Sequence, residues 1–391
     1  MATRRKFIEN VLAGGIGGIV TSSFAPFPIL DDHGRDDRTV PLFEAQKIHD
    51  ECLIFDGHND TPVERVARGQ NVSGLLESNK EYHTDFPRMK QVGYDAASFI
   101  VGNGVVANVW TTMEQTLSMI EANPDKFLLI RSSKDVLKAK ETGRVGILMS
   151  IEGIAKWIQG EPDILRMLYR TGVKWVAITH GEGGSPQSGE KGSSSSKGKN
   201  IYLQGTPSPN APCTPSERKA ELNNTKGLTS FGKEVVAMSN QLGVVTDLAH
   251  INDKAFFDVL EITSKPVVVS HAGSFSVYNH YRNVTNDQIK AIAANGGVIG
   301  ILLFSAYLAR KKEDITLNTF IRHITHIADL VGVDHVGIGT DFDGGTDLLY
   351  TDMSQLVKIT QGMMEHGFNK EEIKKIWGYN FMRVLEQNID G

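Results

Sequence analysis

Histidine and acidic residues recur where apolar segments of this 391-residue sequence end. They follow six such segments, and they are His58 and Asp60, Glu152, His180, Asp247 and His250, His271, and Asp341 and Asp343. Imidazole nitrogens and carboxylate oxygens together suit a borderline divalent ion, with zinc as the default. The pattern therefore predicts a metal centre.

The supply of ligands favours two metal ions over one. A single catalytic zinc takes about three protein ligands, whereas His58, Asp60, Glu152, His250 and His271 are available before His180 and Asp341 are counted. We therefore expect two ions about 3.5–4 Å apart, bridged by a carboxylate and a hydroxide. Glu152 is the natural bridging ligand.

Each of these residues also has a plain structural explanation when it is taken alone. A lone histidine after a strand usually packs in a loop, and an aspartate before glycine usually forms a turn. Other histidines of the sequence serve as a comparison, because they do not follow an apolar segment in this way. They are His33, His49, His83, His323, His326, His335 and His366. The recurrence at strand ends is what favours a shared site.

The elements that must position these residues alternate between strand and helix patterns. Apolar, β-branched runs predict eight strands, at residues 53–56, 96–101, 146–151, 175–179, 244–248, 266–270, 298–304 and 336–339. Helical periodicity separates most of them, and Thr285, Gln288 and Gly296 predict a capping box and a C-terminal stop. This alternation predicts an α/β fold of parallel strands, and the eight repeats favour a closed (β/α)8 TIM barrel over an open sheet. Active sites of such barrels lie at the carboxyl ends of the strands. On the first strand His58 and Asp60 should project together, because side chains alternate between faces.

The composition excludes several classes of protein. A net charge of −5 without a basic stripe argues against a nucleic-acid partner. Two cysteines, Cys52 and Cys213, are too few for a disulfide scaffold or a cysteine-based zinc site. One disulfide between them stays open, beside the reading of two separate buried thiols.

The N-terminal segment is expected to direct export. Thr3 to Ile8, with Arg4-Arg5-Lys6, resembles a twin-arginine signal, and the Gly-rich apolar run that follows is too short to span a bilayer comfortably. Residues 1–40 are therefore interpreted as signal and linker, and residues 41–391 as the barrel domain. The expected location is the periplasm or outside the cell, with membrane contact only if the signal stays uncleaved.

Several motifs together resemble the membrane dipeptidase (renal dipeptidase, peptidase M19) family. They are "DGHND" with His58 and Asp60, "SIEG" with Glu152, "THG" with His180, "DLAH" with His250, "SHAGSFSVYNHYRNV" with His271 and Arg282, and "GTDFDG" with Asp341. The resemblance covers about residues 48–387. The family is similar to the amidohydrolase barrels and uses two zinc ions to hydrolyse dipeptides.

The resemblance implies a role for each matching residue. His58 and Asp60 would hold the first zinc, His250 and His271 the second, and Glu152 would bridge the two Zn²⁺ ions of each chain. On the substrate side, Asp341 would shuttle a proton, His180 would stabilise oxyanion charge, and Arg282, with Tyr307 beside it, would hold the C-terminal carboxylate. A homodimer is plausible from the resemblance alone.

The sequence also departs from the family pattern. Residues 181–226 form an unusually long stretch rich in Gly, Ser, Pro and Lys, interpreted as an extended loop that serves as a lid, a docking surface or inert length. Some family members have a histidine shortly after the bridging glutamate, where this chain reads "EGIAKW". Two other hypotheses stay open: a lactonase or deaminase of the amidohydrolase type, and a non-catalytic peptide-binding protein. The side-chain preference and a D-residue at the second position are also undecided.

Overall fold

The computed structural model describes residues 39–103, 108–158, 161–180, 211–224 and 227–390. Apart from residues 39 and 40, the expected export signal and linker lie outside this part of the chain. Among the described residues, no helix combines the length and apolar character needed to cross a bilayer.

The strands form a parallel barrel, as the alternating pattern predicted. They are β1 (Ile54–Asn59), β2 (Tyr94–Gly102), β3 (Phe127–Leu129), β4 (Val145–Ile151), β5 (Val173–Ala177), β6 (Val245–Asp247), β7 (Val268–Ala272), β8 (Val298–Ile301) and β9 (Val336–Ile338). Eight of them pair in the order β1-β2-β4-β5-β6-β7-β8-β9, and all pairs are parallel. The short strand β3, which the sequence pattern missed, pairs with β4 off this path.

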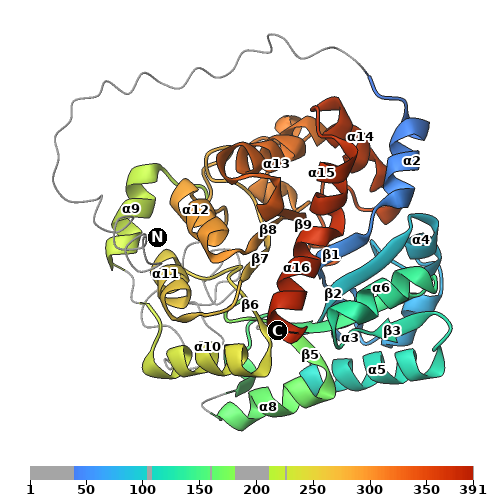
Figure 1. The fold of residues 1–391 in the computed structure, drawn as a ribbon, viewed down its shortest axis with the longest axis horizontal. Helices are drawn as coiled ribbons and strands as arrows, with labels where there is room; N and C mark the ends of the chain where they lie inside the picture. The colour runs from blue at the N-terminus through green and yellow to red at the C-terminus, as the bar shows by residue number, and fades with distance from the viewer. Residues whose placement is uncertain (1–38, 104–107, 159–160, 181–210, 225–226, 391) are drawn as a thin grey trace.

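Helices connect the strands and lie around them (Figure 1). They are α2 (Leu42–Glu51), α3 (Thr61–Ala67), α4 (Phe86–Gln91), α5 (Val109–Ala122), α6 (Ser133–Glu141), α7 (Ala155–Ile158), α8 (Pro162–Thr171), α9 (Pro215–Asn224), α10 (Ser230–Leu242), α11 (Asp253–Ile262), α12 (Asn286–Asn295), α13 (Leu317–Val331), α14 (Val357–Glu365), α15 (Lys370–Lys374) and α16 (Asn380–Leu385). The predicted capping box of Thr285 and Gln288 begins α12, and Gly296 ends it with a φ of 83°. The fold is thus a (β/α)8 TIM barrel.

The barrel nearly closes where β1 meets the segment that follows β9. Asn59 and Phe342 form a parallel bridge, and the amide of Asp60 donates to the Phe342 carbonyl oxygen at 2.8 Å. Below this bridge the buried carboxylate of Asp56 accepts hydrogen bonds from the Tyr94 hydroxyl and the Thr340 hydroxyl, both at 2.6 Å. Three strands therefore meet at one carboxylate directly under the strand ends that carry the predicted ligands.

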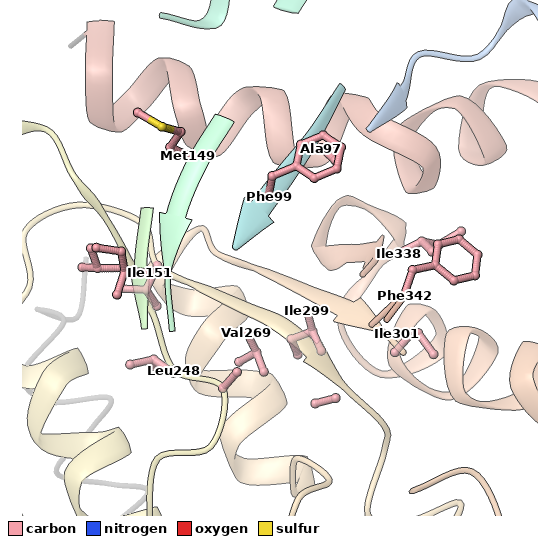
Figure 2. Packing of buried hydrophobic residues seen from close by; sticks show 14 of the residues in the cluster. Ala97, Phe99, Met149, Ile151, Leu248, Val269, Ile299, Ile301, Ile338 and Phe342 are labelled. Carbon is pink, nitrogen blue, oxygen red and sulfur yellow. The ribbon is translucent and has the colours of Figure 1, made fainter. Parts of the chain in front are cut away.

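Two layers of apolar side chains hold the strands in place. The larger layer packs between the strands and the helices, and Figure 2 shows part of it, with Phe99, Met149, Ile299 and Ile338 among the labelled residues. The smaller layer, which includes Phe55, Trp175, Val268 and Val298, joins strand residues to α16. Both exclude water from the strands and so make the barrel a rigid support for the residues at its carboxyl end.

Phe381 of α16 fills the space among the strands in this second layer. Its ring lies against Phe55 and Trp175, with ring centroids 5.8 Å and 5.6 Å away. A Cβ atom added at Gly57 or at Gly337 would lie 2.6 Å from this ring. The two glycines therefore provide the room that the ring occupies.

Replacing Phe381 with alanine is expected to lower the free energy of unfolding by about 3–5 kcal/mol, because it leaves a cavity in a close-packed layer. Chemical denaturation followed by circular dichroism measures this change. Tyr379, two residues earlier and 43% exposed, provides the control: Y379A should change the stability by less than about 1 kcal/mol. Equal effects of the two substitutions would show that Phe381 does not anchor α16 to the barrel.

Two expectations about the rest of the chain are settled within the described residues. The thiols of Cys52 and Cys213 are buried and free, so they do not form a disulfide. The interpretation of residues 181–226 as an extended loop is wrong for residues 215–224, which form α9, while residues 181–210 and 225–226 lie outside the described chain. The polar composition of α9 hid its helix, because Arg218 is the only buried residue among its described side chains.

Candidate metal centre and substrate pocket

The predicted ligands converge at the carboxyl end of the barrel. Their donor atoms fall into three groups whose members all lie within 4.8 Å of one another. The groups are His58, His271 and Asp341; Glu152, His180 and His250; and His58, Asp60 and Glu152. Residues that are up to 283 positions apart in the sequence thus form one cluster because parallel strands bring their carboxyl ends to the same face.

Glu152 lies at the centre of this cluster. Its Oε1 atom is 3.0 Å from His250 Nε2, 3.4 Å from His271 Nε2 and 3.8 Å from His58 Nε2. Its Oε2 atom is 3.3 Å from His180 Nε2. A carboxylate that faces four imidazoles from four strand ends has the position that a bridging ligand requires.

His58 and Asp60 project together, as their spacing predicted, with 3.1 Å between His58 Nε2 and Asp60 Oδ2. Simple alternation does not explain this arrangement, since Gly57 already faces the barrel interior beside Phe381. The pairing of β1 with β2 is irregular between Asp56 and Asn59, and such irregularities redirect side chains. The β7–β8 pairing is likewise irregular between Val269 and Ala272, on either side of His271.

The cluster fits divalent metal ions. Within the described part of the chain, His58 Nε2 and Glu152 Oε1 are buried, and although polar atoms lie 3.1 and 3.0 Å from them, none is aligned for a hydrogen bond. The Nε2 atoms of His250 and His271 lie 2.9 Å apart. Buried polar atoms are normally satisfied, and a cation between these nitrogens and oxygens would satisfy them. The imidazole and carboxylate donors are those of zinc sites.

The electrostatic environment of the cluster favours added positive charge. Burial opposes a charge on His58, but the carboxylates of Asp60, Glu152 and Asp341 outweigh it and raise the pKa of His58 to about 10. Burial raises the pKa of Glu152 well above its usual value. A metal cation among these carboxylates would supply the positive charge that the site otherwise draws from protons.

His250 and His271 are in the form that binds metals. Burial lowers the pKa of both well below the usual value, and the positive charge of Arg282 acts in the same direction. A neutral imidazole keeps a lone pair for a metal. The other ring nitrogen of His271 is held by the Ser270 hydroxyl, 2.8 Å away, which orients the ring.

The backbone is left-handed at three residues of the pocket. His250, Asp341 and Asp343 have φ values of 62°, 62° and 64°, and they are the only non-glycine residues with positive φ in the described chain. This conformation is unfavourable for residues with a Cβ, although Asp and His tolerate it better than most. Strain of this kind gathers at functional sites because the surrounding structure imposes it.

Asp341 is packed close to the metal ligands. Burial raises its pKa to about 7, against the opposing effect of His58 and with a contribution from the negative charge of Asp60. A Cβ atom at Gly344 would lie 2.2 Å from Asp341 Oδ1 and 2.7 Å from Asp60 Oδ2. Only glycine therefore allows the chain to approach the two carboxylates so closely.

Arg282 borders the cluster beside His250 and His271. Its Nη2 atom lies 3.0 Å from His250 Nε2 and 3.3 Å from the His271 carbonyl oxygen. Its Nε atom is buried and has no hydrogen-bond partner among the described residues. The ring of Tyr307 lies 5.3 Å from its Cζ atom, so the two residues predicted to bind a carboxylate are neighbours.

A cavity of about 300 Å³ contains these groups. It is lined by Asp60, Glu152, His180, His250, Arg282, Tyr307 and Asp341, and also by residues that the sequence analysis did not assign to the site, among them Glu64, Asn103, Arg218 and Phe304. Asn103 follows β2, one of the two predicted strands that are followed by no histidine or acidic residue, and only those residue types were sought. Its position just after a strand end was the available signal.

One of the histidines used for comparison, His83, does contact a residue of the pocket. It follows no strand, but its Nδ1 atom accepts a hydrogen bond from the amide of Asp343 at 2.9 Å. Asp343 in turn accepts from the amide of His83 at 2.8 Å and from the Thr61 hydroxyl at 2.6 Å. His83 therefore supports a pocket residue from a distant loop.

Comparison with known proteins agrees with this geometry. The sequence matches the family model of membrane dipeptidase (peptidase family M19) over residues 42–197 and 206–390. Dipeptidase verJ of Clonostachys rogersoniana is 29% identical, with 92% of this chain and 88% of the relative covered. Dipeptidase tcpJ of Claviceps purpurea (strain 20.1) is 24% identical, with 86% and 77% covered.

Two solved structures share the fold. Dipeptidase AC, a metallo peptidase of family M19, has a TM-score of 0.74 at 24% identity, with 86% of this chain and 99% of that chain covered. A metallo peptidase from Rhodobacter sphaeroides, liganded with a phosphinate mimic of L-Ala-D-Ala, has a TM-score of 0.73 at 23% identity and the same coverage. They show the shared fold, and the family match over most of the sequence places this chain in the membrane dipeptidase family of metallopeptidases, peptidase family M19.

Proposed function

We propose that this protein is a zinc-dependent dipeptidase that requires a free C-terminal carboxylate on its substrate. The observation that supports this most directly is the position of Arg282, whose Nη2 atom lies 3.0 Å from the predicted metal ligand His250. One residue of extended chain spans only about 3.3–3.6 Å. A carboxylate held by Arg282 therefore leaves room for about one residue before the scissile bond reaches the metal centre.

The metal ions would be held by the clustered ligands. His58 and Asp60 would bind one ion, His250 and His271 the other, and Glu152 would bridge them. When bound, two such ions supply a water of lowered pKa and polarise the scissile carbonyl. This proposal of two zinc ions is supported by the surplus of imidazole and carboxylate donors around Glu152.

The side chains around the metal centre would orient the substrate, stabilise negative charge and transfer a proton. Arg282 would orient the substrate through a bidentate pair with its carboxylate. His180, whose Nε2 lies 3.3 Å from Glu152 Oε2, would donate a hydrogen bond where negative charge develops on the carbonyl oxygen. Asp341 would accept the proton of the attacking water and return it to the leaving amine.

The proposed substrates include dipeptides with a D-residue at the C-terminal position. The Rhodobacter sphaeroides metallo peptidase was solved with a mimic of L-Ala-D-Ala, and that is a property of that protein. It motivates a panel of L-Ala-L-Ala and L-Ala-D-Ala for this one. An amidohydrolase acting on lactones or amines is less well supported, because such substrates need not present a carboxylate to Arg282.

Replacing Arg282 with alanine is expected to lower kcat/KM for dipeptides by about 10²-fold or more. A bidentate pair of charge-assisted hydrogen bonds is worth at least about 3 kcal/mol. Release of free amino acids from L-Ala-L-Ala, L-Ala-D-Ala and L-Ala-L-Ala amide measures the effect. The wild-type enzyme should prefer the acids to the amide, and R282A should lose that preference. An unchanged preference would contradict the carboxylate clamp.

A further inference from the structure

Arg218 is a buried arginine of α9 with a complete set of partners. Its Nε and Nη2 atoms donate to the two carboxylate oxygens of Asp253 at 2.8 and 2.7 Å, and Nη2 also donates to Gln288 Oε1 at 3.1 Å. Its Nη1 atom donates to the carbonyl oxygens of Asn283, at 2.5 Å, and His280, at 3.3 Å. A guanidinium has five N–H donors, so Arg218 has none left for a substrate.

The two carbonyl groups that Arg218 binds lie on either side of Arg282. They belong to the loop between β7 and α12, which carries Arg282 to the rim of the metal centre. The same loop pairs with the chain just before α9: the amide of Cys213 donates to the Asn279 carbonyl oxygen and the amide of Tyr281 to the Ala211 carbonyl oxygen, both at 3.1 Å. Residues 211–218 therefore form one wall behind the loop.

The other side of the loop is held by the side chain of Asn283. Its Oδ1 atom accepts from the amide of Gly273 at 2.8 Å, and its Nδ2 atom donates to the carbonyl oxygens of Tyr278, at 2.9 Å, and Tyr307, at 2.8 Å. Arg218 binds the carbonyl group of this same Asn283. The backbone next to Arg282 is thus fixed from both sides, and Arg218 supplies the side that comes from the long segment after His180.

The ion pair between Arg218 and Asp253 also balances the positive charge of Arg218. Only 5% of Arg218 is exposed, and a buried charge is stable when it is paired and fully hydrogen-bonded. Asp253 offsets the positive charge of Arg218, whereas Arg282 has no carboxylate partner among the described residues. Arg282 therefore remains the cation of the pocket that can receive an anion.

We propose that Arg218 is a positioning residue that holds Arg282 in place for the substrate carboxylate. This inference rests on the proposed function, in which Arg282 binds the C-terminal carboxylate of a dipeptide. It assigns a role to part of the 181–226 segment: residues 211–218 fix the carboxylate clamp. Small displacements of a binding group can cost about 10²-fold in catalytic efficiency, so the effect should be measurable.

Kinetics of the full-length, metal-loaded R218M and R218K variants test the proposal. For a dipeptide acid, KM should rise about 10- to 100-fold while kcat changes little, because substrate positioning and not the metal centre is affected. The residual rate on the dipeptide amide, which offers no carboxylate, should stay the same. R218K should restore only a small part of the wild-type affinity for the dipeptide acid, since lysine has three donors and no planar fork. R166M, on the exposed surface of α8, provides the matched control.

A double variant and a measurement without turnover make the test decisive. R218M combined with R282A should be no worse than R282A alone, and hydrogen–deuterium exchange should rise in residues 279–284 of R218M but not of R166M. Equal losses on the acid and the amide, an additive double variant, or unchanged exchange would each overturn the proposal. If the wild-type enzyme cleaves no dipeptide, the proposed function fails, and the exchange result still decides whether Arg218 holds the loop. If R218M does not fold, R218K answers the same questions.

Discussion

Replacing Glu152 with alanine is expected to remove bound metal and to lower kcat/KM by about 10³-fold or more. Its Oε1 atom lies 3.0 Å from His250 Nε2 and 3.4 Å from His271 Nε2, so the substitution removes the one carboxylate shared by the two proposed ions. Without a bridging anion, two neighbouring cations would repel each other, so we expect metal to be lost together with several kcal/mol of transition-state stabilisation.

Metal content per chain, measured by elemental analysis after gel filtration, is the primary readout, and dipeptide turnover is the second. E141Q, at an exposed residue where α6 ends before the start of β4, should leave both unchanged. The wild-type protein should carry about two zinc ions and should lose turnover with a chelator. An E152A protein that keeps two ions and a rate within tenfold of wild type would show that Glu152 is not the bridge.

The fold and the clustering of the candidate ligands could be predicted from the sequence because their signals are local and repeated. Each strand is a short apolar run, and six of the eight predicted runs end beside a histidine or an acidic residue, as with Glu152 after β4 and His271 within β7. The barrel then converts a repeated local pattern into one site, because all its parallel strands end on the same face. No long-range contact had to be known in advance.

Other features depend on contacts that no local pattern contains. Strand β3 has three residues, Phe127–Leu129, which is too short for a periodic signal. His83 lies in a polar loop, and its partner Asp343 is 260 positions away. Each is defined by a neighbour in space, so neither residue type nor spacing indicates it.

Arg218 shows the same limit at a site that matters for function. It lies in a stretch whose composition suggested a loop, and its partners Asp253, Asn283 and Gln288 come from other elements. An arginine in a polar segment is usually a solvated surface residue. Only the packed structure distinguishes this one, since all its donors are occupied and its side chain is buried.

The common direction of His58 and Asp60 was predicted correctly, but the alternation of side chains along a strand explains it only in part. Alternation along β1 predicted that His58 and Asp60 point the same way, and they do. Yet Gly57 and His58 are adjacent and both face inward, which a regular strand does not allow. The pairing of β1 with β2 is irregular between Asp56 and Asn59, and this irregularity changes the direction of the side chains. Alternation in the sequence does not predict that change.

Replacing Asp341 with asparagine is expected to lower kcat by about 10²- to 10⁴-fold, because asparagine keeps the shape of the side chain but cannot accept and return a proton. The carboxylate is buried beside His58 and Asp60 with its pKa raised to about 7, an environment in which a carboxyl group can exchange protons near neutrality. The KM for a dipeptide should change little, since Arg282 still binds the substrate carboxylate. D334N, on the opposite end of the barrel and 58% exposed, should retain the wild-type rate.

This substitution also separates two roles for Asp341, because its carboxylate lies within ligand distance of the group formed with His58 and His271. A proton shuttle predicts two zinc ions per D341N chain together with the slow kcat. A metal ligand predicts that metal content and activity fall together, and that added zinc restores part of the rate. Full activity with full metal content would remove Asp341 from both roles, and the proton would then have to move through another group of the pocket, with His180 the nearest candidate beside Glu152.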